Sequence, residues 1–250
     1  MSSVCKTTFV TVFILVLAHA ASIAQFTTSK YEIGLSLGTL VYQGDLSRSF
    51  KGDFKSLAPS LGLHVSKTID RYFSLRASLQ FGRLAADELN YATPEWKQHR
   101  AFNFSTPVTE LSSTLVFNLF GENNSDISHR LSPYVFAGAG ITFLNIKRDW
   151  SALDKVFYDE KSGVQQGLAI DTVHSLPKVT PVLPVGAGVR FALSSQFSLT
   201  AEANYRLTAT DYLDGFKYSG NPKKRDSYYG LSLGVSYRLG GYKCPKLLDD

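Results

Sequence analysis

The sequence has little cysteine and, beyond its first residues, no long apolar run. Two cysteines occur in 250 residues. Cys5 lies in a segment that we expect to be removed, so no intramolecular disulfide can form in the mature chain. No apolar stretch after residue 24 approaches the roughly 20 residues that a membrane-spanning helix needs. These absences exclude a disulfide-stapled domain and a helical membrane protein.

Motifs typical of metal sites, redox sites and phosphate-binding sites are also missing. The chain has no HExxH, no CxxC, no glycine-rich phosphate loop, no internal repeat and no low-complexity segment. The formal net charge is only +5, and the bases are scattered apart from Lys223-Lys224-Arg225. A nucleic-acid partner therefore has no support. We expect no enzymatic activity, no catalytic residue, no cofactor and no metal.

The N terminus has the features of a secretory signal. Lys6 precedes an apolar run from Phe9 to Ala18, and Ser22-Ile23-Ala24 is a small-residue cleavage site. The run is too short for a membrane helix and ends at that site. We expect a signal peptide over residues 1–24, an outer-membrane β-barrel over residues 25–241 and a short periplasmic tail over residues 242–250.

Large apolar residues alternate with small or polar ones along much of the mature chain. Near the C terminus, Leu231, Leu233 and Val235 alternate with Ser232 and Gly234. This period of two predicts strands with one apolar face. Eight such strands are expected, over residues 31–42, 57–66, 71–83, 102–120, 132–146, 179–193, 197–210 and 227–239.

The connections between these strands alternate in length. Short links follow the second, fourth and sixth strands, and longer ones span residues 43–56, 84–101, 147–178 and 211–226. An even strand count with this asymmetry predicts an eight-stranded antiparallel transmembrane β-barrel, all-β, with short periplasmic turns and long outward loops. A soluble barrel of the lipocalin type is the alternative. It would expose far more apolar surface than a soluble protein tolerates.

The polar faces of the strands carry seven charges. Facing lipid, these side chains would be costly, whereas inside the barrel guanidinium and carboxylate groups can pair. An eight-stranded barrel is narrow enough to be filled by side chains. We therefore interpret the interior as a packed lumen charge network, with a pore, a transporter or a barrel enzyme acting on lipid or peptide as alternatives. Its members are Glu32, Arg76, Glu110, Arg190, Glu202, Arg206 and Arg238.

Several short motifs together resemble one family. They are Tyr42-Gln43-Gly44-Asp45, TELS at 109–112, SPYVFAGAG at 132–140, TDYLD at 210–214 and CPK at 244–246. The chain is similar in these to the PorG-like outer-membrane β-barrels of Bacteroidetes. The resemblance implies a non-enzymatic accessory or structural role in type IX protein secretion, a system of protein transport. It also implies contact with periplasmic ring proteins of the PorK–PorN type.

Two further groups of residues follow from an outer-membrane location. The last strand resembles the signal that the barrel-assembly machinery reads, although Leu239 replaces the usual final aromatic residue. Expected partners are thus outer-membrane lipid, the assembly machinery and the ring proteins. The assembly signal comprises Ser232, Gly234, Tyr237 and Leu239. The periplasmic contact residues would be Glu122, Asp126, Arg130, Cys244 and Lys246.

Overall fold

The computed structural model describes residues 31–48, 52, 56–121, 130–220 and 226–239. The predicted signal peptide and tail lie outside the described residues, as do Glu122, Asp126, Cys244 and Lys246.

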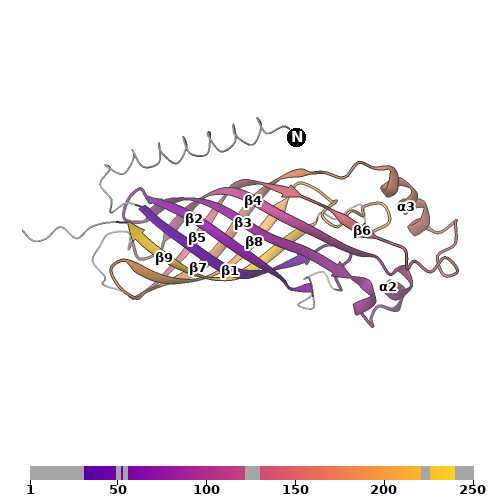
Figure 1. Ribbon diagram of the computed structural model, residues 1–250, viewed down its shortest axis with the longest axis horizontal. Helices are drawn as coiled ribbons and strands as arrows, with labels where there is room; N and C mark the ends of the chain where they lie inside the picture. Colours follow the sequence, from indigo (N-terminus) through magenta and orange to yellow (C-terminus); the bar gives the residue numbers. More distant parts are fainter. Residues whose placement is uncertain (1–30, 49–51, 53–55, 122–129, 221–225, 240–250) are drawn as a thin grey trace, which may run out of the picture.

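Eight long strands wrap into a closed barrel (Figure 1). Their order around the barrel is β3-β2-β1-β9-β8-β7-β5-β4, and pairing of β3 with β4 closes it, every neighbour being antiparallel. The predicted eight-stranded antiparallel barrel is confirmed, with strand ends within a few residues of those expected. The strands are β1 Tyr31–Gln43, β2 Ala58–Thr68, β3 Phe73–Asp87, β4 Asn103–Asn118, β5 Leu131–Leu144, β7 Val179–Ala192, β8 Phe197–Thr208 and β9 Ser227–Leu239.

Side chains alternate between a buried polar interior and an exposed apolar exterior. On β4, Glu110 and Thr114 are buried, while Leu111 and Leu115, the residues that follow them, are exposed. The same alternation on the other strands gives the barrel a belt of exposed leucine, valine, isoleucine and phenylalanine side chains. This polarity is the reverse of a soluble barrel and is that of a transmembrane one. The lipocalin-type alternative is therefore wrong.

The two ends of the barrel differ. At one, which we call the turn end, β2 joins β3 through residues 69–72 and β7 joins β8 through residues 193–196. Asp70 Oδ1 accepts hydrogen bonds from the backbone N–H groups of Tyr72 and Phe73, which holds the first of these turns. The described chain also begins and ends here. The four long connections lie at the opposite loop end (Figure 1).

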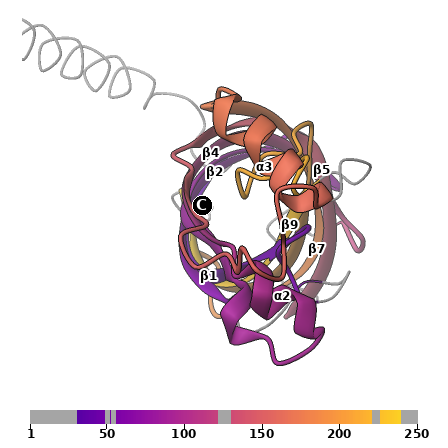
Figure 2. The same cartoon turned by 90° about the vertical axis from the view of Figure 1, so that its right-hand side faces the viewer.

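The long connections contain short elements that the period-two pattern did not predict. They are η4 Glu88–Asn90, α2 Glu95–Arg100, α3 Gly163–Val173 and β6 Lys147–Asp149, which pairs with β4. Figure 2 shows α2 and α3 on opposite sides of the barrel mouth. Strand β3 also runs four residues beyond its expected end, to Asp87. No helix in the described part of the chain is long and apolar enough to cross a membrane.

Candidate functional site

The barrel interior contains three buried ion pairs between strands far apart in the sequence. Arg76 Nη1 lies 2.6 Å from Glu202 Oε1, and Arg206 Nε lies 2.6 Å from Glu110 Oε2. Arg190 Nη2 lies 3.3 Å from Glu32 Oε1. Each pair joins strands on different sides of the barrel, so the side chains cross the lumen and fill it. The structure thus brings together six of the seven predicted lumen charges.

Arg238, the seventh predicted lumen charge, is only half-buried. It stands in register with Glu32 on the neighbouring strand, but within the described residues it forms no ion pair. Three carboxylates cannot pair one-to-one with four guanidiniums, and Arg238 lies nearest the turn end. It is the lumen cation whose charge has the easiest access to water.

Two tyrosines and two amides complete the lumen network. Tyr134 Oη donates to Glu202 Oε1 at 2.5 Å, and Tyr228 Oη donates to Glu110 Oε2 at 3.0 Å. Arg206 also donates to Gln80 and Asn204. Charge alone did not reveal these neutral partners. The alternation along the strands could have identified them, since all four occupy the polar face of their strands.

A small polar cavity remains between these groups. Its volume is about 50 Å³, and its lining includes Arg76, Glu110, Thr114, Glu202 and Arg206. A buried water needs roughly 10–15 Å³ of such space, so the cavity holds a few waters and not a continuous column. Arg76 Nε and Thr114 Oγ1 have no protein partner among the described residues, which fits a hydrated pocket.

At the loop end, a buried ionic cluster joins three of the long connections, the third through a hydrogen bond from Arg100 Nη1 to the Ser219 carbonyl at 3.2 Å. Arg100 of α2 pairs with Glu88 of η4 through two of its nitrogens, and Lys97 lies 3.5 Å from the same carboxylate. Lys97 Nζ also donates to the carbonyls of Asp45 and Ser47, at 2.9 and 2.6 Å. Burial lowers the pKa of Lys97, whereas the hydrogen-bonded Glu88 raises that of Arg100 against its burial. These contacts anchor α2 to the β1–β2 connection.

The carboxylate of Asp171 fastens α3 to the β8–β9 connection. It accepts hydrogen bonds from the backbone N–H groups of Lys217, Tyr218 and Ser219 at 2.9–3.1 Å, and from Ser219 Oγ at 2.7 Å. Arg148 of β6 donates to the Asp171 carbonyl at 2.9 Å. No sequence motif identified Asp171, because its partners are backbone groups 46 to 48 residues away.

A third cluster, at the mouth, places one tyrosine hydroxyl between two carboxyls. Tyr42 Oη lies 2.6 Å from Asp214 Oδ2 and 2.7 Å from Asp226 Oδ1. One hydroxyl has one hydrogen to give, so a carboxyl must carry a second proton. Burial raises the pKa of Asp214 to about 8, and burial together with the neighbouring Asp214 raises that of Asp226. Tyr42 and Asp214 come from two of the motifs that carried the family resemblance.

This acid pair is sealed from solvent. Acid–base enzymes use carboxyls with raised pKa values, but such groups must also reach a substrate. Asp214 is 0% exposed and Asp226 is 1% exposed. The backbone of Gly44 packs directly against the cluster, and a Cβ at this position would lie 1.9 Å from Tyr42 Oη. The arrangement suits structural support and does not suit turnover.

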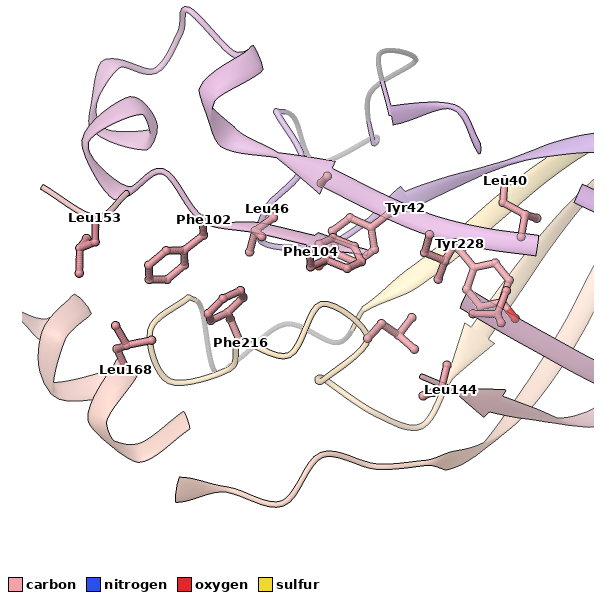
Figure 3. Packing of buried hydrophobic residues seen from close by; sticks show 14 residues of the cluster. Leu40, Tyr42, Leu46, Phe102, Phe104, Leu144, Leu153, Leu168, Phe216 and Tyr228 are labelled. Atoms are coloured by element: carbon pink, nitrogen blue, oxygen red, sulfur yellow. The ribbon is translucent and has the colours of Figure 1, made fainter. Parts of the chain in front are cut away.

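An apolar cluster fills the space between these polar contacts. Phe102 stacks on Phe216 with ring centroids 4.4 Å apart, and Tyr42 meets Phe104 edge-on at 4.7 Å. Leu153 and Leu168 complete it from the β5–β7 connection (Figure 3). We call this packed assembly of the four long connections the cap. Glu88 is one of its buried anchors.

The remaining predicted site residues lie toward the turn end. Ser232 and Gly234 of β9 face the lumen, whereas Tyr237 and Leu239 face outward beside β1. Arg130 is exposed next to the start of β5. No group of three or more potential metal-ligating side chains occurs among the described residues.

Comparison with known proteins gives a family but no function. The family model described as "Domain of unknown function (DUF6089)" matches residues 6–236. No curated protein matches the chain.

Several solved outer-membrane proteins have a similar shape. Neisserial surface protein A has a TM-score of 0.46 at 13% identity, with 83% of this chain and 96% of that chain covered. Ail of Yersinia pestis scores 0.43 at 11%, covering 84% and 97%. OprG of Pseudomonas aeruginosa scores 0.43 at 11%, covering 85% and 98%. Likenesses at this level say nothing about ligand or activity.

Proposed function

The chain belongs to DUF6089, a family of unknown function, and from its own residues we propose a non-enzymatic, non-conducting barrel of the bacterial outer membrane. The observation that carries this proposal is the lumen. Three ion pairs cross it, and the cavity they leave has a volume of only about 50 Å³. A static barrel with a rigid cap is suited to holding other components in place. The loop end would then face outward and the turn end the periplasm.

We propose further that this barrel is an accessory component of type IX protein secretion that contacts a periplasmic ring. Support comes from the resemblance motifs, two of which meet in the cluster of Tyr42 and Asp214. The described turns at the turn end are short and offer little surface. The contact would therefore use residues 121–131 and the tail beyond Leu239, including Cys244 and Lys246.

Conductance tests the closed lumen directly. Pure protein inserted in planar bilayers should give no steady open current, because the paired charges leave no continuous water path. A porin in the same bilayers is the positive control. A reproducible conductance from this chain would overturn the non-conducting proposal and favour the pore alternative.

Deleting the tail tests the role in secretion separately. Removal of residues after Gly241 should leave the barrel in the outer membrane, since β9 ends at Leu239. Export of type IX cargo and co-purification of ring proteins should both fall. A matched control deletes residues 160–161, which are exposed on the cap, and should leave both unchanged. Normal export by a strain lacking the whole protein would remove the secretion role and keep the barrel.

A further inference from the structure

On the outer surface of the barrel, β3, β4 and the β5–β6 segment run side by side toward the loop end. Residues that lie opposite each other on these strands form rows, which we call levels. Phe81 and Phe143 flank Thr109, and Phe81 is 40% and Phe143 45% exposed. These rings mark the upper border of the apolar belt on this side. Toward the loop end from these rings, the next exposed side chain on β3 is the cation Arg83 and not an apolar residue.

Directly above the two rings lie two cations. Arg83 of β3 lies opposite Pro107 of β4 in the strand register. Lys147 of β6 lies opposite Ser105, two residues nearer the loop end and on the other side of β4. Both side chains are exposed and point outward. Two strand spacings separate β3 from β6, about 10 Å, so the long side chains can converge over β4. Neither cation forms an ion pair or hydrogen bond with any described residue.

One level higher again, the charge reverses. Asp87 and Asp149 flank Asn103. The carboxylate of Asp149 accepts the Ser151 N–H at 2.9 Å, which lowers its pKa, so it stays ionised. Asp87 accepts the Leu89 N–H at 3.0 Å. These acids stand between the two cations and the solvent beyond the cap.

We propose that Arg83 and Lys147 form a binding site for the phosphate headgroup of an anionic membrane lipid. Apolar rings lie directly below the two cations, so a ligand that contacts both must have an apolar part and an anionic part. Its acyl chains would contact the belt beside Phe81 and Phe143, and its phosphate would meet the two cations at the border. A soluble polyanion would have to approach past Asp87 and Asp149, which repel it. The site needs the barrel to sit in a membrane but does not need a role in secretion.

Lipid titration of the full chain, followed by native mass spectrometry, tests this site. The probes are bis-phosphorylated lipid A and the same lipid with its phosphates removed. The wild-type chain should prefer the phosphorylated form, and the double variant Arg83→Gln/Lys147→Gln should lose about 25-fold of that preference, roughly fivefold per cation. The swapped variant Arg83→Lys/Lys147→Arg should keep most of it.

The control removes two charges at the opposite border of the belt. Lys67→Gln/Arg71→Gln at the turn end should leave the preference unchanged. Because neither Arg83 nor Lys147 has a described partner, the test variant should fold normally, and its heat-shifted mobility on gels verifies this. Equal binding of both lipids by the wild type would contradict the proposed site. So would a loss of the preference in the control variant as large as that in the test variant. Competition by inorganic phosphate alone at similar concentration would assign it to a free anion and refute the lipid proposal.

Discussion

At the residue scale, this protein depends on charges that are buried and paired. Arg206 and Glu110 illustrate it, since both are nearly inaccessible and each satisfies the other. A buried pair adds little net stability compared with apolar residues, but a single charge left behind is costly. The loss of stability caused by a substitution therefore depends on whether it leaves a partner charge buried and unpaired.

Arg206→Ala should lower the free energy of unfolding by roughly 3–5 kcal/mol, because it leaves the Glu110 carboxylate buried and unpaired. Urea titration of the barrel refolded into lipid vesicles measures this change. Arg238→Ala is the matched control: Arg238 is half-buried and forms no ion pair within the described chain, so its loss should cost less than about 1 kcal/mol. Equal effects of the two variants would contradict the paired-lumen account.

The Tyr42–Asp214–Asp226 cluster should make the cap less stable as pH rises. Burial raises the pKa of Asp214 to about 8, against an ordinary value near 3.8. The proton is held more tightly in the folded state, so this stabilisation is complete below about pH 4, falls progressively as pH rises, and is lost by about pH 8. Asp45 and Asp211 add repulsion on ionisation, and Arg100 offsets part of it.

Hydrogen exchange of the 211–219 backbone amides reports this loosening. Protection, corrected for the intrinsic pH dependence of exchange, should fall progressively between about pH 4 and about pH 8 in the wild type and level off above that. Asp214→Asn should flatten that change, since the amide keeps the shape and cannot ionise. An unchanged pH profile in the variant would show that other groups control the cap.

At the scale of elements, the cap is built by close approach of short segments. Gly167 of α3 lies so near the β8–β9 connection that a Cβ there would be 2.2 Å from the Tyr218 carbonyl oxygen. Asp171, one turn later on the same helix, binds the N–H groups of that connection. Helix α3 is thus held by contact with distant backbone and not by its own propensity, which is low for eleven residues.

Gly167→Ala should separate α3 from the β8–β9 connection. Alanine normally favours a helix over glycine by about 1 kcal/mol, but overpacking against backbone costs roughly 1–3 kcal/mol. The expected result is faster proteolysis of the cap with the barrel intact. Gly163→Ala is the control, since nothing lies within 4 Å of a Cβ at that position. Equal protease resistance of both variants would contradict this docking.

At the scale of the whole molecule, an apolar belt surrounds a polar interior. The exterior of the strands exposes side chains such as Leu37, Leu233 and Leu183, at 64%, 69% and 53%. Water solvates such a surface poorly, whereas lipid or detergent covers it.

The folded protein should therefore need detergent or lipid, and its gel mobility should depend on heating. We expect unheated protein to migrate as a compact monomer and boiled protein at its full mass of 27.6 kDa or slightly less after processing. Size-exclusion chromatography in detergent provides the check on oligomeric state. Recovery of folded protein in plain buffer would contradict the membrane-barrel assignment.

The sequence alone determined the barrel, because a period of two depends only on neighbouring residues along one strand. It also placed the seven lumen charges on the inner face. Tertiary structure decided which charges pair, since Arg76 and Glu202 lie 126 residues apart and meet only when the barrel closes. It also decided the cap, whose anchors Lys97, Asp171 and Tyr42 bind partners in other connections. No local pattern encodes such contacts; they exist because the closed barrel brings four loops to one end.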